Sequence, residues 1–146
     1  MEKRDILLLF FCLPIAGKKE ILSPIQIMKS MFLLSKENEI KDFYRFHPYL
    51  YGPCSLEVYK DIDSLVRDGF ISQVPSSHRW KYFKITKKGE EACETLFNEA
   101  EKVFLDNLKR LKDLVLGKNL FELLNYVYES YPEYAENSIV HVSLLK

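Results

Sequence analysis

The chain has 146 residues, of which 47% are hydrophobic and 14% are aromatic, and its 21 basic side chains balance 21 acidic ones. This composition excludes a disordered tail and supplies enough apolar surface for one core, so we expect a single compact unit. The net charge of zero removes the simplest argument for nucleic-acid binding, and any such function has to depend on local charge.

The N-terminal segment is predicted to form a buried helix over residues 3–13, because its apolar run leaves no polar face. The basic pair Lys3 and Arg4 ahead of this run also imitates a secretory signal. Asp5 interrupts the basic-to-apolar boundary and Pro14 disturbs the cleavage pattern, which makes export the less favoured interpretation. The run of about ten residues is too short to span a bilayer, so we expect no membrane association.

The cysteines favour a cytoplasmic location. Cys12, Cys54 and Cys93 are far apart and show no C-x-x-C spacing. Their odd number argues against a disulfide framework and against a thiolate metal site. Cys54 precedes a predicted helix, where a thiol can become reactive, but burial is the usual state of a free cysteine.

The next predicted elements are two further helices around an irregular segment. The second helix is expected after Ser23, a favourable N-cap residue that is followed by Pro24 in the first turn. Residues 42–54 mix aromatic residues with Pro and Gly, which predicts a loop or an irregular strand. The third helix is expected between Ser55 and Gly69. Its predicted apolar stripe consists of Leu56, Tyr59, Ile62, Leu65 and Val66.

A hairpin and a long helix complete the main pattern. Residues 70–74 and 80–85 are predicted strands around a turn, because the return strand alternates between apolar and polar residues. Thr86 is expected to cap a long amphipathic helix over residues 87–115 that ends near Gly117. A helix over residues 120–128 is expected before a turn and a short terminal helix or strand. The order is therefore helix, helix, helix, hairpin, long helix.

The junctions around the hairpin carry short motifs. Residues 65–71 are Leu-Val-Arg-Asp-Gly-Phe-Ile, and residues 85–89 are Ile-Thr-Lys-Lys-Gly. With the capped helix ahead of them, they resemble the L-x-x-D-G-x-I and T-x-x-G motifs of PadR-like winged-helix regulators. Residues 51–55, Tyr-Gly-Pro-Cys-Ser, are similar over a shorter stretch to the Y-G-P-x-S motif of the Panacea and SocA-like antitoxin group.

The resemblance to PadR-like regulators implies an α+β, mostly helical fold. This fold is a winged helix-turn-helix with a two-stranded wing and C-terminal dimerisation helices. Residues 1–90 would form the winged-helix domain, and residues 91–146 a C-terminal helical extension within one compact unit. The implied function is that of a DNA-binding transcription regulator, either a repressor or an antitoxin-like autoregulator, that acts as a homodimer.

Local charge is divided between the predicted DNA-binding elements. Residues 55–68 hold two bases and four acids, a net charge of −2, whereas residues 78–88 hold five bases and no acid. A winged helix places its third helix in the major groove and its wing along the phosphates, so positive charge is expected on both. The acidic third helix is the main observation against DNA binding.

Candidate contacts to double-stranded DNA come from the third helix, from the hairpin region and from the second helix, which crosses the DNA backbone in this architecture. They are Ser55, Lys60, Ser64, Arg67, Arg79, Lys81, Lys84, Lys87, Gln26 and Lys29. Two alternatives remain open. Ser55 can serve only as an N-cap, and the hairpin lysines can form only a solvated surface.

A homodimer is expected because the helix over residues 87–116 is longer than a domain of this size needs, which would leave its apolar stripe uncovered in a monomer. A two-fold dimer would bind a palindromic site. If the C-terminal segment folds back on the stripe, the monomer is closed and this argument fails. The candidate interface residues are Leu96, Val103, Phe104, Leu108 and Leu111.

No motif indicates catalysis. The histidines are isolated, and the sequence has no Gly-rich phosphate loop and no nucleophile elbow, so we expect no enzyme, no metal and no cofactor. The alternative function is a winged-helix protein–protein interaction module in a larger bacterial or phage assembly. The acidic third helix and the neutral net charge favour this alternative.

Overall fold

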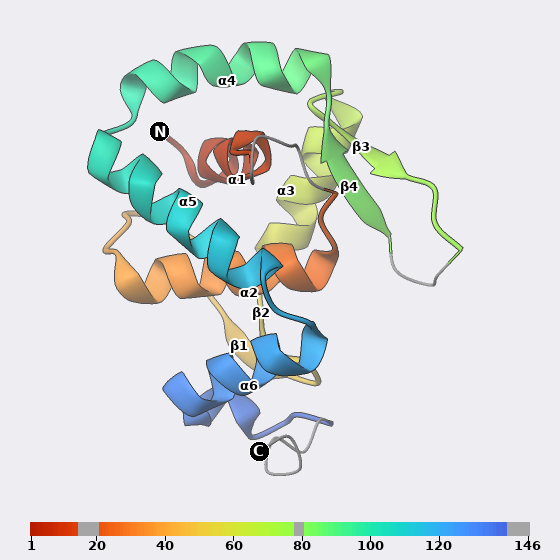
Figure 1. Ribbon diagram of the computed structural model, residues 1–146, viewed down its shortest axis with the longest axis vertical. Helices are drawn as coiled ribbons and strands as arrows, with labels where there is room; N and C mark the ends of the chain where they lie inside the picture. The colour runs from red at the N-terminus through yellow and green to blue at the C-terminus, as the bar shows by residue number, and fades with distance from the viewer. Residues whose placement is uncertain (15–20, 78–80, 140–146) are drawn as a thin grey trace.

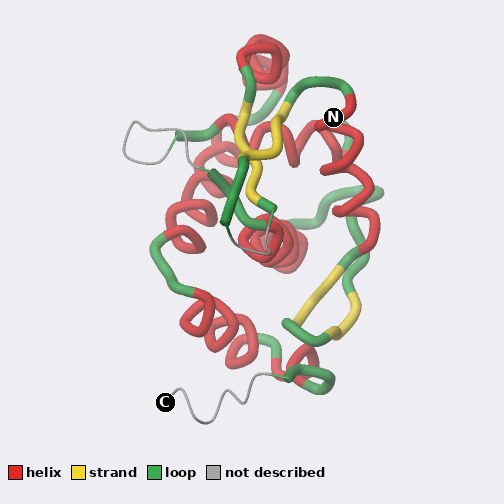
Figure 2. Tube along the Cα trace, turned by 90° about the vertical axis from the view of Figure 1, so that its right-hand side faces the viewer, coloured by secondary structure: helices red, strands yellow, loops and turns green. Residues whose placement is uncertain are grey.

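The computed structural model describes residues 1–14, 21–77 and 81–139. This part of the chain is an α+β fold that is mostly helical, and its strands form two separate antiparallel pairs, β3 with β4 and β1 with β2 (Figure 1 and Figure 2). The elements are α1 (Lys3–Cys12), α2 (Pro24–Glu37), β1 (His47–Tyr49), β2 (Gly52–Cys54), α3 (Leu56–Arg67), β3 (Ile71–Val74), β4 (Tyr82–Ile85), α4 (Lys87–Glu99), α5 (Lys102–Leu116), α6 (Leu120–Ser130) and the 3-10 helix η1 (Pro132–Ala135).

The first helix is the centre of the core. Every residue from Ile6 to Leu13 is buried, and Phe10 and Phe11 are completely enclosed. Helices α3, α4 and α5 pack around α1, which Figure 1 shows between α4 and α5. The prediction of a buried first helix is confirmed. In the described residues, no helix is both long enough and apolar enough to cross a membrane.

The start of α2 follows the expected capping chemistry. The Ser23 hydroxyl accepts from the Gln26 amide at 3.2 Å, and the Gln26 side chain accepts from the Ser23 amide at 2.9 Å. This reciprocal capping box satisfies two of the free N–H groups of the first turn. Just before it, Leu22 exchanges two backbone hydrogen bonds with Phe83 at 2.8 and 2.9 Å. Leu22, just ahead of α2, therefore lies beside β4 of the hairpin.

The hairpin has one buried and one exposed face, as the alternation predicts. In its register Ile71 pairs with Ile85 and Ser72 pairs with Lys84. Ile71 and Ile85 are buried, whereas Ser72 and Lys84 are exposed. Gly69, with φ of +81°, reverses the chain between α3 and β3 in a conformation that favours glycine.

The junction after the hairpin explains the short motif at residues 86–89. The Thr86 hydroxyl accepts from the Gly89 amide at 3.1 Å and donates to the Gly69 carbonyl at 2.6 Å. A Cβ atom at Gly89 would lie 2.1 Å from the Phe70 carbonyl oxygen. The start of α4 can approach the backbone ahead of β3 this closely only because residue 89 has no side chain.

The prediction of a single long helix over residues 87–115 is wrong. The chain leaves the helical conformation at Ala100, where ψ is 142°, and α5 then returns across α2 (Figure 1). A continuous helix of this length would extend about 45 Å, whereas the ten residues of α1 span about 15 Å. The break lets both halves bury their apolar sides against the same core, α4 on α1 and α5 on α1 and α2.

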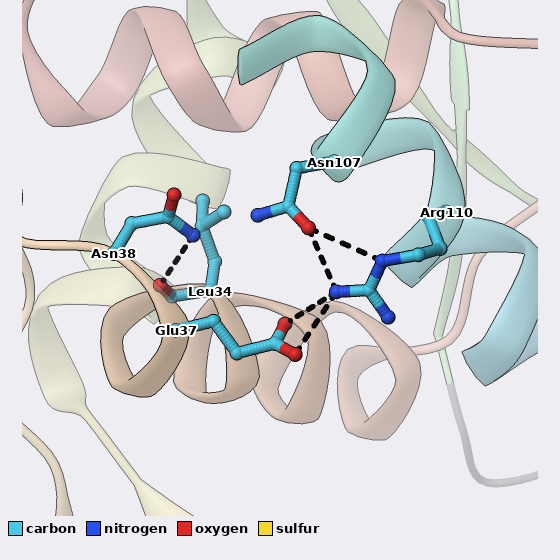
Figure 3. Close-up of polar contacts among 5 residues, drawn as sticks. All are labelled: Leu34, Glu37, Asn38, Asn107 and Arg110. Atoms are coloured by element: carbon cyan, nitrogen blue, oxygen red, sulfur yellow. Dashed lines mark hydrogen bonds and ion pairs between the residues drawn. The ribbon is translucent and has the colours of Figure 1, made fainter. Parts of the chain in front are cut away.

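Polar contacts fix the packing of α5 on α2 (Figure 3). One guanidinium nitrogen of Arg110 donates to both Glu37 carboxylate oxygens at 2.9 Å and to the Asn107 side chain at 2.7 Å. At the end of the same helix α2, the Asn38 side chain donates to the Leu34 carbonyl at 3.2 Å (Figure 3). The Arg110–Glu37 contacts join the C-terminal turn of α2 to α5, whereas the Asn38 contact caps the end of α2.

A buried lysine closes the end of α1. Lys112 of α5 is fully buried, and its ammonium donates to the carbonyl oxygens of Phe10, Phe11 and Leu13 at 2.6, 3.2 and 2.5 Å. The last carbonyls of a helix have no partners within it and carry its partial negative charge. The Lys112 ammonium donates hydrogen bonds to these carbonyls and brings a positive charge to this end of the helix. Lys112 therefore caps the C-terminus of α1.

The last α-helix, α6, lies at the end of the molecule opposite α4 (Figure 1). α6 packs against β2 and η1, which lies within the segment where a turn was expected. The short helix or strand expected after that turn falls largely on residues 140–146, outside the described residues. Phe32 of α2 makes edge-on ring contacts with Phe46, Tyr131 and Tyr134, at centroid distances of 5.4, 5.2 and 4.6 Å. This aromatic cluster attaches the C-terminal segment to α2.

Candidate nucleic-acid interface

Helix α3 presents three rows of residues, and each row has a different environment. The buried row, Val58, Ile62 and Leu65, packs into the core. The paired row, which contacts α1 and the segment before β1, consists of Glu57, Asp61, Ser64 and Asp68. The outward row consists of Leu56, Lys60, Asp63 and Arg67, all of them exposed. The predicted apolar stripe is therefore wrong in part, because Leu56 is 73% exposed and Tyr59 is 41% exposed.

Two cations of α1 occupy the ends of the paired row. The Lys3 ammonium forms an ion pair with Glu57. The Arg4 guanidinium bonds the Ser64 hydroxyl and forms an ion pair with Asp68 at 2.7 Å. The hydrogen bond from Lys3 lowers the pKa of Glu57, and the hydrogen bond from Arg4 lowers the pKa of Asp68.

A tyrosine occupies the middle of the paired row. The buried Tyr44 hydroxyl donates to the Asp61 carboxylate at 2.5 Å. Burial first, and this hydrogen bond second, raise the pKa of the Tyr44 phenol. Tyr44 therefore stays protonated and continues to donate to Asp61.

These contacts change the electrostatic balance of α3. Lys3 and Arg4 compensate two of the four acids in residues 55–68 locally, although Glu2 and Asp5 beside these cations leave residues 2–5 with no net charge. In the sequence alone, these two cations indicate only a possible export signal. Neither spacing nor periodicity connects them to residues 57 and 68, since more than 50 positions separate the partners.

Exposed cations occur on the outward row, on the hairpin and at the start of α4. Lys60 and Arg67 are exposed on α3, and Lys81 and Lys84 are exposed on and beside β4. Lys87, in the first turn of α4, is exposed as well. Between residues 81 and 88 every charged side chain is basic. The described surface therefore contains cations on each element that the winged-helix hypothesis places against DNA.

Two predicted DNA contacts lie in the core. Ser55 is 1% exposed, and Lys29 is 3% exposed with its ammonium bonded to the Pro53 carbonyl at 2.9 Å. Ser55 occupies the N-cap position of α3, but its hydroxyl makes no cap hydrogen bond and has no partner among the described residues. Both predictions are wrong, because neither side chain can reach a base or a phosphate.

Three other candidates have different outcomes. Ser64 accepts from Arg4, so its hydroxyl is already engaged with α1. Gln26 is half-buried and closes the capping box of α2, which explains its presence without DNA. Arg79 lies outside the described residues, together with the adjacent positions 78 and 80.

Some of the candidate dimer residues are buried and others are exposed. Leu108 and Leu111 are 0% and 1% exposed because α5 packs on α1 and α2 within one chain, so their assignment to a dimer interface is wrong. Leu96 and Phe104 are half-buried, and Val103 is 79% exposed. The long uncovered stripe that motivated the dimer does not exist in this fold.

The described residues contain no cluster of three or more His, Cys, Asp or Glu side chains that could hold a metal ion. Cys54 is half-buried, and burial raises the pKa of its thiol, which opposes the reactive thiolate considered above.

Comparison with known proteins does not identify the chain. No protein-family model matches it, and no curated protein matches it at a significant level. The resemblances to PadR-like regulators and to the Panacea and SocA-like group therefore remain predictions. Any functional conclusion has to come from the rows of α3, the hairpin cations and the packing that positions them.

Proposed function

We propose that this protein is a cytoplasmic, DNA-binding transcription regulator with a winged helix-turn-helix fold. In this proposal α3 is the recognition helix and the β3–β4 hairpin is the wing. The regulator acts as a repressor or as an antitoxin-like autoregulator.

The arrangement of the first 90 residues supports the winged-helix part of the proposal. Helices α1, α2 and α3 precede the β3–β4 hairpin, and α4 follows directly after it. Leu22, between α1 and α2, pairs with Phe83 and adds a short third strand segment to the wing. Such a three-segment sheet next to a three-helix core is the usual layout of a winged helix, in which the third helix enters the major groove.

One observation carries the functional part of the proposal: cations of α1 pair with two of the four acids of α3. Glu57 and Asp68 are paired with Lys3 and Arg4, so these carboxylates do not face solvent as free charges. The main argument from sequence against DNA binding was the net charge of −2 on this helix. With Glu57 and Asp68 paired, the exposed cations of the hairpin region supply the positive charge that phosphate binding needs.

The residues of the outward row and of the hairpin take specific roles in this proposal. Lys60 and Arg67 face the major groove, while Lys81 and Lys84 contact phosphates along the wing. Lys87 adds a cation beside the first turn of α4, where free backbone N–H groups also attract phosphate. Arg67 is the residue best suited to a bidentate contact with guanine.

The homodimer remains a prediction, as does the palindromic site that it would need. Of the residues proposed for its interface, Leu96, Val103 and Phe104 are still at least partly exposed. Sedimentation of the wild-type chain and of Val103→Asp tests this prediction directly. A dimer formed through this surface becomes a monomer in the variant, whereas a wild-type monomer refutes the dimer.

The experiment that tests DNA binding compares two variants with the same change in charge. One replaces Lys60, Lys81 and Lys84 by alanine, and the other replaces Lys41, Lys102 and Lys109, which are exposed elsewhere. Fluorescence anisotropy measures binding to random duplex DNA and to DNA from the upstream region of the gene. We expect the first variant to lose at least about tenfold in affinity at low salt and the second to lose little. Equal losses contradict the proposed surface.

A second function, that of a protein-docking module, is favoured by a different observation. Leu56, Tyr59, Tyr49 and Leu50 are exposed side chains of α3 and of the β1–β2 hairpin. Exposed apolar groups in one region are typical of protein interfaces. If the wild-type chain binds no duplex DNA at low salt, this docking function becomes the better account.

A further inference from the structure

An apolar pocket lies between α2, the β1–β2 hairpin and the first turn of α3. Its volume is about 550 Å³, which is within the range of small-molecule sites. The apolar part of its wall is formed by Ile25, Met28, Pro48, Tyr49, Leu56 and Tyr59. The pocket is separate from the paired row of α3, which faces α1.

One cation belongs to the lining of this pocket. Lys29 is 3% exposed, and the contact that its ammonium makes among the described residues is a single hydrogen bond to the Pro53 carbonyl at 2.9 Å. No carboxylate of the described chain forms an ion pair with it. Burial lowers the pKa of Lys29 to about 8, and the nearby Cys54 thiol opposes this shift.

A buried ammonium without a counter-charge is unfavourable, because the low dielectric around it penalises its charge. Its one hydrogen bond leaves two of the three donors of the ammonium without a described partner. Lys112 shows the contrast within the same chain, since three carbonyl oxygens surround its ammonium. The Lys29 ammonium therefore lacks a counter-charge and two hydrogen-bond acceptors among the described residues, which an anion bound in the pocket would supply.

We propose that this pocket binds a small organic anion that has an apolar body and one carboxylate, such as a medium-chain or aromatic carboxylic acid. The carboxylate pairs with Lys29 and accepts its remaining hydrogen bonds, while the body lies against the apolar wall. Charge complementarity selects this occupant over a neutral apolar molecule. An inorganic anion would leave the apolar wall exposed to water, and a protein segment would have to bring a carboxylate to the same depth.

The test of this site contains no DNA, so its outcome can be distinguished from that of the DNA-binding experiments. Titration calorimetry of the full chain with octanoate and with its neutral amide, octanamide, compares two ligands with the same apolar body. We expect octanoate to bind at least about tenfold more tightly than octanamide, since a buried charged hydrogen bond is worth about that factor or more. Equal affinities, or no binding of octanoate at millimolar concentration, overturn the proposal.

Two variants locate the interaction. Lys29→Met removes the charge and keeps the length of the side chain, and we expect it to lower octanoate affinity to that of octanamide. Lys36→Met changes an exposed lysine of the same helix and should leave both affinities unchanged. Leu56→Asp places a carboxylate at the exposed rim of the pocket, where it should weaken octanoate binding more than octanamide binding. If both Lys29→Met and Leu56→Asp bind octanoate as the wild type does, the anion lies elsewhere and the proposal is wrong.

Discussion

The guanidinium of Arg4 in α1 lies 2.7 Å from the carboxylate of Asp68 at the end of α3. The same guanidinium bonds Ser64 and lies 5.6 Å from the centre of the Phe70 ring. Arg4 therefore connects the buried first helix to the junction between the recognition helix of our proposal and its wing. Its main consequence is electrostatic, because it neutralises an acid next to the surface that would face phosphate.

The first prediction concerns this pair. In Arg4→Ala the Asp68 carboxylate loses its partner and faces the DNA as a free negative charge, so we expect duplex affinity to fall about threefold at low salt. In the double variant Arg4→Ala with Asp68→Asn the charge is absent and affinity should return to near the wild-type value. Fluorescence anisotropy measures both.

Arg110→Ala is the matched control for Arg4→Ala. Arg110, on α5, forms an ion pair with Glu37, on α2, and neither residue belongs to α3. It should bind DNA like the wild type. If Arg110→Ala weakens binding as much as Arg4→Ala does, or if Asp68→Asn restores nothing, the neutralisation of α3 by α1 is not what permits binding.

The second prediction concerns the cap of α1. Lys112→Met leaves the carbonyls of Phe10, Phe11 and Leu13 without the ammonium that now satisfies them, which should lower the free energy of unfolding by about 3 kcal/mol. Lys109→Met, on the exposed side of the same helix, should change it by less than about 0.5 kcal/mol. Urea unfolding followed by circular dichroism compares the two. Similar losses in both variants would show that the capping contacts add nothing.

The third prediction concerns Gly89. An added Cβ would lie 2.1 Å from the Phe70 carbonyl oxygen and 2.6 Å from the Ile85 side chain, so Gly89→Ala has to move α4 away from the hairpin. We expect a loss of about 2 kcal/mol or more in the free energy of unfolding. Gly117→Ala is the comparison, since its nearest contact is 3.1 Å away. A Gly89→Ala chain that melts at the wild-type temperature would contradict the close approach.

The fourth prediction concerns the pH dependence of stability at Lys29. Its folded pKa of about 8 lies below the ordinary value of 10.5. Between these values the unfolded chain binds a proton that the folded chain has released, so stability rises with pH there. Relative to Lys29→Met, the free energy of unfolding of the chain that keeps Lys29 should rise by about 2 kcal/mol from about pH 8 to about pH 9.5.

The comparison with Lys29→Met is needed because other titratable groups line the same pocket or its rim. They are His47, Tyr49, Tyr51, Cys54 and Tyr59. Burial raises the pKa of the Cys54 thiol and of the Tyr59 phenol, which lowers stability as pH rises. Because the Cys54 thiol interacts electrostatically with Lys29, both chains also carry Cys54→Ser, and the difference between them then isolates Lys29. If the difference in free energy of unfolding between the two chains stays constant or falls over this pH range, the pKa of Lys29 is not lowered by burial.

Local signals in the sequence were sufficient for much of the fold. The capping residues Ser23 and Thr86, the end of α3 at Gly69 and the alternation in β4 each depend on neighbours within a few positions. Those predictions are confirmed. The motif at residues 86–89 has a local cause, the Thr86 cap of α4, and a second cause that is not local, the close approach of Gly89 to the Phe70 carbonyl.

The failures have a common physical cause, which is packing between distant segments. No Gly or Pro marks the break at Ala100 in the sequence. We attribute the break to packing, because α4 packs on the short helix α1 and α5 packs on α1 and α2. Val58 and Leu56 are both apolar, and only contact with the core decides that Val58 is buried while Leu56 faces out. Lys29 and Lys112 are expected at the surface by residue type, but backbone carbonyls of other elements hold them inside.

The candidate site was predicted in part for the same reason. Lys60, Arg67, Lys81, Lys84 and Lys87 are exposed, as their residue type and periodicity predict. Lys3 and Arg4 were missed as partners of α3 because the contacts span more than 50 residues of sequence.

The salt dependence of duplex affinity tests the central claim most directly. Each phosphate contact contributes about −0.9 to the slope of log affinity against log salt concentration. If Lys81, Lys84 and Lys87 contact phosphate, as their proposed roles require, the wild type should show a slope of about −3 between about 50 and 200 mM salt. The variant with Lys60, Lys81 and Lys84 replaced by alanine should show a slope of about −1. A wild-type chain with no salt-dependent binding, or a variant that keeps the full slope, contradicts DNA recognition by this surface.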